Sequence, residues 1–119
     1  MSLKFYNTLT RKKEAFKSIH KNFVGIYSCG PTVYWYAHLG NFRTYIFSDL
    51  LKRVLIFNKY KVKHIMNITD VDDKTIKGSV KEGLSLNELT EKYEKIFLED
   101  MDSMGIMKPT ILKATDNIN

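Results

Sequence analysis

The sequence predicts an α/β fold with an incomplete parallel sheet, and three observations lead to this prediction. Residues 22–28 and residues 61–69 have the β-branched and aromatic composition of strands. Between them, residues 39–59 carry apolar side chains about every four positions, which indicates one face of a helix. The order strand, helix, strand is a βαβ unit, so we expect a parallel pair joined by a right-handed crossover.

The long helix is expected to have a single apolar stripe. The side chains that form it are Phe42, Ile46, Leu50, Val54 and Phe57. Three charged residues of the same segment, Asp49, Lys52 and Arg53, are expected to face elsewhere.

Two more helices are predicted after the second strand. Asp72 and Asp73 favour the first turn of a helix over residues 72–81, which Gly83 would end. Ser85 and Glu88 have the spacing of a capping box. They precede a helix whose apolar positions are Leu86, Leu89, Tyr93, Ile96, Phe97, Met101 and Met104, and which Gly105 would end.

The remaining elements leave the predicted sheet open. Residues 3–9 predict a short first strand, followed by a polar, basic connection. Residues 113–119 are expected to add no closing element. Two parallel strands and one short strand would leave apolar faces and edges uncovered, so either the chain dimerises or it is the leading piece of a larger protein.

The composition is that of a soluble globular domain, with 119 residues, 44% hydrophobic and 27% charged. One cysteine excludes an internal disulfide, and no apolar run predicts a signal peptide or a membrane span, so we expect a cytoplasmic protein. The net charge of +6 is uneven, because residues 1–21 are basic and residues 82–104 are mostly acidic. The basic part is either a surface for polyanions or a solvated lysine-rich face.

Candidate functional residues follow the predicted strands, because parallel sheets bind ligands at the carboxyl ends of their strands. Cys29, beside Gly30 and Pro31, ends the first strand, and Thr69 and Asp70 end the second. A lone cysteine is most often a small buried side chain. At a strand end it could instead be a nucleophile, with His38 as its base, or a zinc ligand, although this chain has no CxxC or HxxxH spacing to complete a zinc site.

The start of the long helix is a candidate anion site. A helix N-terminus favours an anion by about 0.3–1 kcal/mol, and Gly40 lets backbone amides approach a ligand. His38 and Asn41 would offer hydrogen-bond donors to the same anion. The aromatic residues 34–36 either stack a base or only cover the cleft. His20 and His64 are interpreted as structural.

Taken together, YSCGPTVYWYAHLGNFRTY and NITDVDDK, in this order, resemble the cysteinyl-tRNA synthetases, a family of class I aminoacyl-tRNA synthetases. KFYNTLTRKKEAF and GIMKPTILKAT are similar to the same family, so the resemblance covers nearly the whole chain. It implies the first half of a Rossmann-like nucleotide-binding domain. It also implies an enzyme that activates L-cysteine with ATP and Mg²⁺ and transfers it to tRNA(Cys).

The resemblance also implies roles for individual residues. Cys29 matches the first zinc ligand of the family. His38, Gly40 and Asn41 match the signature that holds the ATP phosphates, with His38 and Asn41 as the catalytic residues. Gly30, Thr32 and Thr69 match positions that line the amino-acid pocket. Trp35 stands where many relatives have an acidic residue, and no role is transferred to it.

Zinc would explain how cysteine is told from serine. A hydrophobic pocket can favour cysteine over serine by a selectivity of no more than roughly 10²-fold, because the two are close isosteres. Zinc, in contrast, binds a thiolate directly. In this interpretation Cys29 holds the metal and is no nucleophile, and the phosphate-binding residues act by positioning and charge stabilisation.

Several parts of the family have no counterpart in residues 1–119: the other zinc ligands, the Lys-Met-Ser-Lys-Ser loop and the tRNA-binding helical domain. We therefore expect these residues to be the N-terminal portion of the catalytic domain, inactive or nearly so without the missing C-terminal half. Two alternatives remain open. One is the related ligase that joins cysteine to a sugar amine, and the other is a stand-alone nucleotide- or RNA-binding module.

Overall fold

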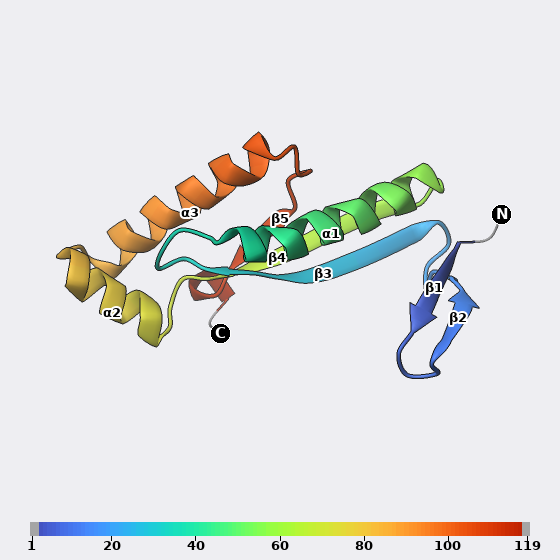
Figure 1. The fold of residues 1–119 in the computed structure, drawn as a ribbon, viewed down its shortest axis with the longest axis horizontal. Coiled ribbons are helices and arrows are strands. Elements are labelled where there is room, and N and C mark those ends of the chain that lie inside the picture. The colour runs from blue at the N-terminus through green and yellow to red at the C-terminus, as the bar shows by residue number, and fades with distance from the viewer. Residues whose placement is uncertain (1–2, 118–119) are drawn as a thin grey trace.

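The computed structural model describes residues 3–117 and confirms an α/β fold (Figure 1). The larger sheet is parallel, with the order β3 (Phe23–Thr32), β4 (Lys61–Thr69) and β5 (Thr110–Lys113). Helix α1 (Leu39–Phe57) joins β3 to β4, and helices α2 (Asp73–Glu82) and α3 (Leu86–Ser103) join β4 to β5. A separate antiparallel hairpin is formed by β1 (Lys4–Asn7) and β2 (Lys12–Ala15), and a short 3₁₀ turn, η1 (Thr115–Asn117), follows β5.

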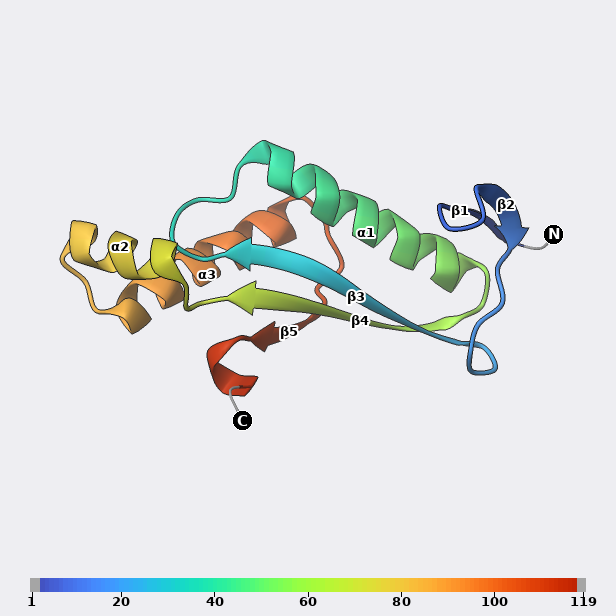
Figure 2. The same ribbon diagram turned by 90° about the horizontal axis from the view of Figure 1, so that it is seen from below.

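The core lies between one face of the parallel sheet and the helices α1 and α3. Alternate residues of β4, namely His64, Met66 and Ile68, are buried on this face. The ring of Phe97 on α3 lies 5.8 Å from the ring of Phe42 and 5.3 Å from that of Tyr45, both on α1. Figure 2 shows α1 running along β3 and β4, with the hairpin and α2 at opposite ends of the molecule.

The prediction of which face of α1 is buried is wrong in part. Phe42 is buried as expected, but Ile46, Leu50 and Phe57 are 46%, 56% and 83% exposed. The sheet-facing side instead buries Asp49 and Lys52, which were expected to face elsewhere. They are buried because both bond to the segment after α3. Asp49 Oδ1 accepts from the amide of Met107 at 3.0 Å, and Lys52 Nζ donates to the carbonyl of Lys108 at 3.5 Å.

The first parallel strand is longer than expected. It continues through Cys29 and Gly30 to Thr32, with a shift of register relative to β4 between Cys29 and Thr32. Pro31 lies within this irregular part and has no amide to donate, so the bulge accommodates it without interrupting the pairing. The chain is therefore still extended at Gly30 and Pro31, and it leaves the strand only after Thr32.

Two strands are missing from the prediction. The expected basic connection contains β2, whose residues are all exposed, and β5 adds a third parallel strand just before the end that was expected to lack structure. The predicted first strand forms as β1, but it pairs with β2 and not with the parallel sheet. Both missed strands have four residues, too few to show a reliable alternation. Residues 118–119 of the predicted end lie outside the described residues.

The predicted caps are confirmed. Asp72 caps α2, accepting from the amides of Lys74 at 2.7 Å and Thr75 at 3.1 Å, and Gly83 ends this helix with a φ of 68°. Ser85 and Glu88 form the capping box of α3. None of the helices in the described range 3–117 is long and apolar enough to cross a membrane.

Candidate active site

The carboxyl end of β3, the loop of residues 34–37, the first two turns of α1 and the start of α2 surround a cavity of about 270 Å³. We call it the strand-end cavity. Its lining residues are Gly30, Pro31, Thr32, Tyr34, Trp35, Tyr36, Ala37, Asn41, Tyr45 and Lys74. The structure thus brings together Gly30, Thr32 and Asn41, which the sequence analysis selected from separate segments.

Gly30 is where β3 and β4 approach most closely. Its amide donates to Oδ1 of Asn67 at 3.1 Å. A Cβ atom here would lie 2.0 Å from the carbonyl oxygen of Asn67 and 2.8 Å from Cγ of Met66. Only glycine fits. One residue pair further along, Thr32 lies opposite Thr69, whose carbonyl accepts from the amide of Val33 at 3.1 Å, so both threonines stand at the same end of the sheet.

His38 and Asn41 together cap the N-terminus of α1. Nδ1 of His38 accepts from the amide of Gly40 at 3.1 Å, and Oδ1 of Asn41 accepts from the amide of His38 at 3.0 Å. The first turn contains no acidic side chain, so nothing in it offsets the positive end of the helix dipole. His38 is exposed beside the strand-end cavity, while Asn41 lines it. This is a geometry that can receive an anion.

Cys29 is exposed, so the interpretation of it as a small buried side chain is wrong. Among the described residues its Sγ donates only to the carbonyl of Gly30, at 3.5 Å, and no hydrogen bond joins it to His38, so the geometry gives it no base for a nucleophilic role. Cys29 does lie near Tyr45. Burial, with a smaller contribution from the charge of Cys29, raises the pKa of Tyr45 to about 12.

A zinc ion would find one ligand here. Within residues 3–117, no group of three or more His, Cys, Asp and Glu side chains is placed to hold a metal ion. An accessible thiol at the end of a strand fits a tetrahedral zinc site only if other segments provide the remaining ligands. Cys29 therefore fits as a single contribution to such a site.

Asp70 has a structural role in this fold. It is buried, and its carboxylate accepts from the amide of Thr115 at 3.0 Å and from the Thr115 hydroxyl. These bonds hold η1 against the end of β4. Thr69, the last residue of β4, is half-buried and does not line the strand-end cavity. The expectation that Asp70 faces a ligand is wrong.

The sequence analysis missed three residues of the strand-end cavity, Ala37, Tyr45 and Lys74. Lys74 Nζ lies 5.5 Å from the centre of the Tyr34 ring, in a cation–π contact. Lys74 ends the NITDVDDK segment, so its position in a distinctive motif was the available signal. Tyr45 falls between the positions of the predicted apolar stripe, but it ends the segment YSCGPTVYWYAHLGNFRTY and so carried the same signal.

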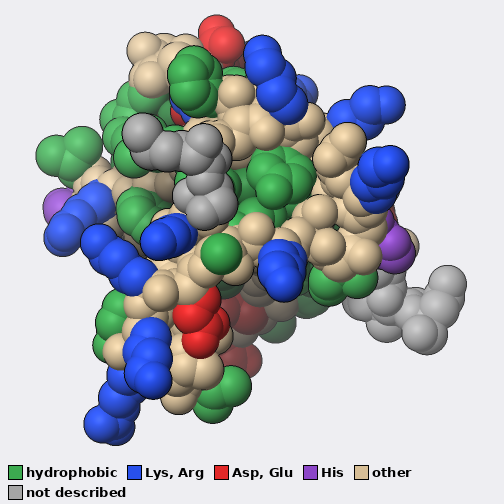
Figure 3. All heavy atoms as spheres, turned by 90° about the vertical axis from the view of Figure 1, so that its right-hand side faces the viewer, with side chains coloured by type: hydrophobic (Ala, Val, Ile, Leu, Met, Phe, Trp, Pro, Cys, Tyr) green, Lys and Arg blue, Asp and Glu red, His purple; other side chains and the backbone are tan. Residues whose placement is uncertain are grey.

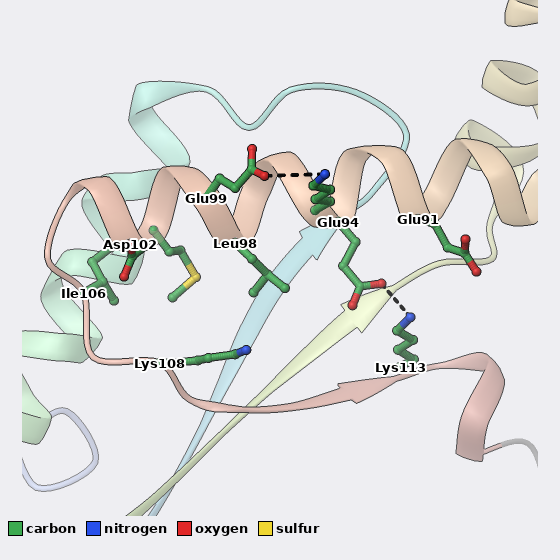
Figure 4. A pocket seen from close by; sticks show the side chains of 10 residues that line it. Glu91, Glu94, Leu98, Glu99, Asp102, Ile106, Lys108 and Lys113 are labelled. Carbon is green, nitrogen blue, oxygen red and sulfur yellow. Dashed lines mark ion pairs between the residues drawn. The ribbon is translucent and has the colours of Figure 1, made fainter.

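Another cavity, of about 520 Å³, lies elsewhere, between α3 and the segment that leads into β5 (Figure 4). Leu98, Met101 and Ile106 are its apolar lining residues. Among its charged side chains, Lys113 pairs with Glu94 at 2.7 Å, and Lys95 lies 3.9 Å from Glu99. None of the predicted site residues lines it, so its size alone does not make it the candidate site.

Comparisons with known proteins identify the family of the chain. The family described as tRNA synthetases class I (C) catalytic domain matches residues 15–119. A cysteine–tRNA ligase of Brachyspira hyodysenteriae is 62% identical over 96% of this chain, and one of Koribacter versatilis is 49% identical over all of it. A cysteine–tRNA ligase of Chlamydia pneumoniae is 55% identical over 89% of the chain. The chain spans about a quarter of the length of these relatives, 22–24%.

Proposed function

The chain belongs to the family of class I (C) tRNA synthetase catalytic domains, and we propose that it forms the N-terminal portion of the catalytic domain of a cysteine–tRNA ligase. The complete enzyme would activate L-cysteine with ATP to cysteinyl-adenylate and transfer the cysteine to tRNA(Cys). The observation that carries this proposal is the strand-end cavity, which adjoins the uncompensated N-terminus of α1. The names of the relatives support the choice of amino acid.

In this proposal the start of α1 binds the ATP phosphates. The side chains of His38 and Asn41 each use one polar atom for the cap, which fixes the orientation of both groups. Nε2 of His38 and Nδ2 of Asn41 then remain to donate to phosphate oxygens, together with the amides near Gly40. Donors held in place before the reaction stabilise the charge that develops on the α-phosphate when the cysteine carboxylate attacks it. Mg²⁺ would accompany the ATP.

Gly30, Thr32 and Thr69 would form the wall of the amino-acid pocket. The amide of Gly30 is already directed to Asn67, so the contribution of Gly30 is to let the two strands approach. The two threonines lie opposite each other and can present hydroxyl groups to the substrate. Zinc, when held by Cys29 and by ligands from the rest of the longer protein, would supply a centre that prefers the thiol of cysteine to the hydroxyl of serine.

The chain alone is proposed to be inactive or nearly so. It supplies one zinc ligand and one phosphate-binding helix end, and the missing C-terminal half would supply the remainder, including the contacts to most of the tRNA. The family relation also supports a location in the cytoplasm, where the ligase would meet tRNA, ATP and L-cysteine.

The test uses the full-length protein that contains this chain. Cysteine-dependent exchange between ATP and pyrophosphate is expected, and tRNA(Cys) is expected to accept the cysteine. Replacing His38 with Ala should lower the exchange rate about 10²-fold or more, as expected for the loss of one positioned donor. The matched control is Lys13→Gln, on the distant hairpin, which should leave the exchange rate unchanged.

Zinc is tested separately with Cys29→Ser. This variant should bind less zinc, measured by elemental analysis, and should discriminate less well between cysteine and serine. Exchange without cysteinylation of tRNA, but with transfer of cysteine to an amino sugar, would show the related sugar ligase instead. A wild-type protein with no cysteine-dependent exchange would overturn the proposal.

A further inference from the structure

Helix α2 carries a row of three exposed lysines. Lys74, Lys77 and Lys81 are three and four positions apart, so they lie on one side of the helix. Across the described part of the chain, none of the three forms an ion pair. Together with Tyr34, Trp35, Gly78 and Glu82 they line a second cavity, of about 300 Å³. We call the three lysines with Trp35 the lysine–tryptophan surface.

Trp35 is exposed and yet held in position. Its side chain is 53% exposed. Its ring packs at 5.3 Å against Tyr36 and at 5.6 Å against Tyr93 of α3, measured between ring centres. A large aromatic ring that is fixed by its neighbours but keeps an exposed surface offers a stacking platform at little entropic cost.

The loop with Trp35 lies against α2 because Gly78 leaves room for it. A Cβ atom at Gly78 would lie 3.1 Å from Leu89 Cδ2 and 3.6 Å from the carbonyl oxygen of Tyr34. The one carboxylate in this cavity, that of Glu82, is already engaged, since Lys92 donates to it at 2.7 Å and the Tyr93 hydroxyl also donates to it. These bonds lower the pKa of Glu82. The positive charge of the three lysines is therefore the dominant feature toward solvent.

We propose that the lysine–tryptophan surface binds a single-stranded RNA segment, with phosphates along Lys77 and Lys81 and a base stacked on Trp35. A row of cations beside an aromatic platform is the combination that single-stranded nucleic acids recognise. This inference rests on the proposed function, whose RNA substrate ends in an unpaired strand. The second cavity shares Tyr34, Trp35 and Lys74 with the strand-end cavity, so a strand bound on this surface is directed toward the candidate active site.

The hairpin end provides the matched control. Figure 3 shows Lys and Arg side chains spread over that end of the molecule. Lys12 and Lys13 on β2 are exposed, and this hairpin lies at the opposite end from α2 (Figure 1). The double variants K77Q/K81Q and K12Q/K13Q thus remove the same charge from two distant surfaces.

The experiment measures binding of a fluorescent eight-nucleotide single-stranded RNA to the full-length protein, by anisotropy at several salt concentrations. K77Q/K81Q should weaken binding about tenfold and reduce the slope of log K against log salt by roughly 1.4, because each phosphate contact on a single strand contributes roughly 0.7. Trp35→Ala should weaken binding about fivefold or more without changing that slope. Trp35→Phe should keep most of the affinity.

Three results would overturn the inference. They are an equal loss with K12Q/K13Q, an affinity that Trp35→Ala leaves unchanged, and a preference for an RNA duplex of the same composition. The proposed function is tested independently, because ATP–pyrophosphate exchange needs no RNA and K77Q/K81Q should retain it. Loss of exchange in the wild-type protein would refute the ligase activity, whereas RNA binding would still report on this surface.

Discussion

Asn41 accepts a hydrogen bond from the backbone amide of His38 at 3.0 Å, while its side chain also forms part of the wall of the strand-end cavity. The same residue therefore stabilises the start of α1 and faces the proposed phosphate site. These two roles make different demands on its chemistry, since the cap needs an oxygen acceptor and a phosphate needs a donor without negative charge.

Replacing Asn41 with Asp should separate the two roles. The carboxylate keeps the acceptor for the His38 amide and is favourable near a helix N-terminus, so the melting temperature should stay equal or rise. ATP binding should weaken about tenfold or more, measured as the KM for ATP in pyrophosphate exchange, because the added charge repels phosphate. Asn41→Ala is the comparison, since it should lose about 0.5–1 kcal/mol of stability with the cap. Unchanged ATP use by Asn41→Asp would contradict the anion site.

Asp49→Ala should destabilise the protein strongly. Asp49 is 7% exposed, accepts from the Met107 amide at 3.0 Å and pairs with Arg53 Nε at 2.7 Å. Its removal leaves the Met107 amide without its acceptor, and we expect a loss of about 2–3 kcal/mol in urea unfolding. Glu99→Ala is the control, because it breaks a long exposed pair with Lys95 at 3.9 Å and should cost less than about 0.5 kcal/mol. Equal costs for the two variants would refute the structural role of Asp49.

Gly30→Ala should disrupt the site, and Gly25→Ala should not. Both glycines lie on β3, but a Cβ at Gly30 would overlap the carbonyl oxygen of Asn67 at 2.0 Å, whereas nothing lies within 4 Å of a Cβ at Gly25. We expect Gly30→Ala to cost more than about 2 kcal/mol, because a backbone atom cannot yield as a flexible side chain can. Thermal unfolding of the two variants compares them directly, and similar melting temperatures would show that the strands are not packed as described.

His64 should make stability depend on pH below neutrality. Its Nε2 bonds to Ser28 Oγ at 2.7 Å, and Nδ1 is buried with no hydrogen-bond partner in the described structure. Burial, with a contribution from Lys52, lowers the pKa of His64, although Asp49 opposes the shift. The unfolded chain therefore takes up a proton below about pH 6.5, before the folded protein does, and stability falls as the pH drops below that value.

The expected slope is at most about 1.4 kcal/mol per pH unit, and it ends below the folded pKa, where both states are protonated. Unfolding in urea between pH 5 and pH 8 measures it. His64→Gln can still bond to Ser28 but does not titrate, so the slope of this variant should be smaller. An identical slope in both proteins would assign the acid sensitivity to other groups.

Local signals explain what the sequence could predict. The helices after β4 have their own capping residues, Asp72 and Ser85, and a glycine that ends α2, so they were located to within a residue or two. The paired strands β3 and β4 were also predicted, because each is long enough to show its composition. Cys29, His38 and Asn41 stood out because they lie near the end of β3 and at the start of α1, in a distinctive segment.

The remaining features depend on tertiary contacts that leave no local pattern. Asp49 and Lys52 are buried only because the segment after α3 passes over them, and that segment is 56 or more positions away in the chain. The carboxylate of Asp70 accepts hydrogen bonds from Thr115, 45 positions away in the chain. Lys74, in the first turn of α2, lines the strand-end cavity and lies over the ring of Tyr34, 40 positions away, which the spacing of residues along the chain does not reveal.

Helix α1 carries apolar side chains on both its buried face and its exposed face. Phe42 and Leu55 are buried in the core, whereas Phe47 and Leu50 are exposed to water on the opposite face. Exposure of these apolar side chains to water is unfavourable, so residues 1–119 by themselves should self-associate as their concentration rises. A further protein segment packed over this face of α1 should prevent the self-association. Rates measured on residues 1–119 alone would then reflect aggregation as much as the catalysed reaction.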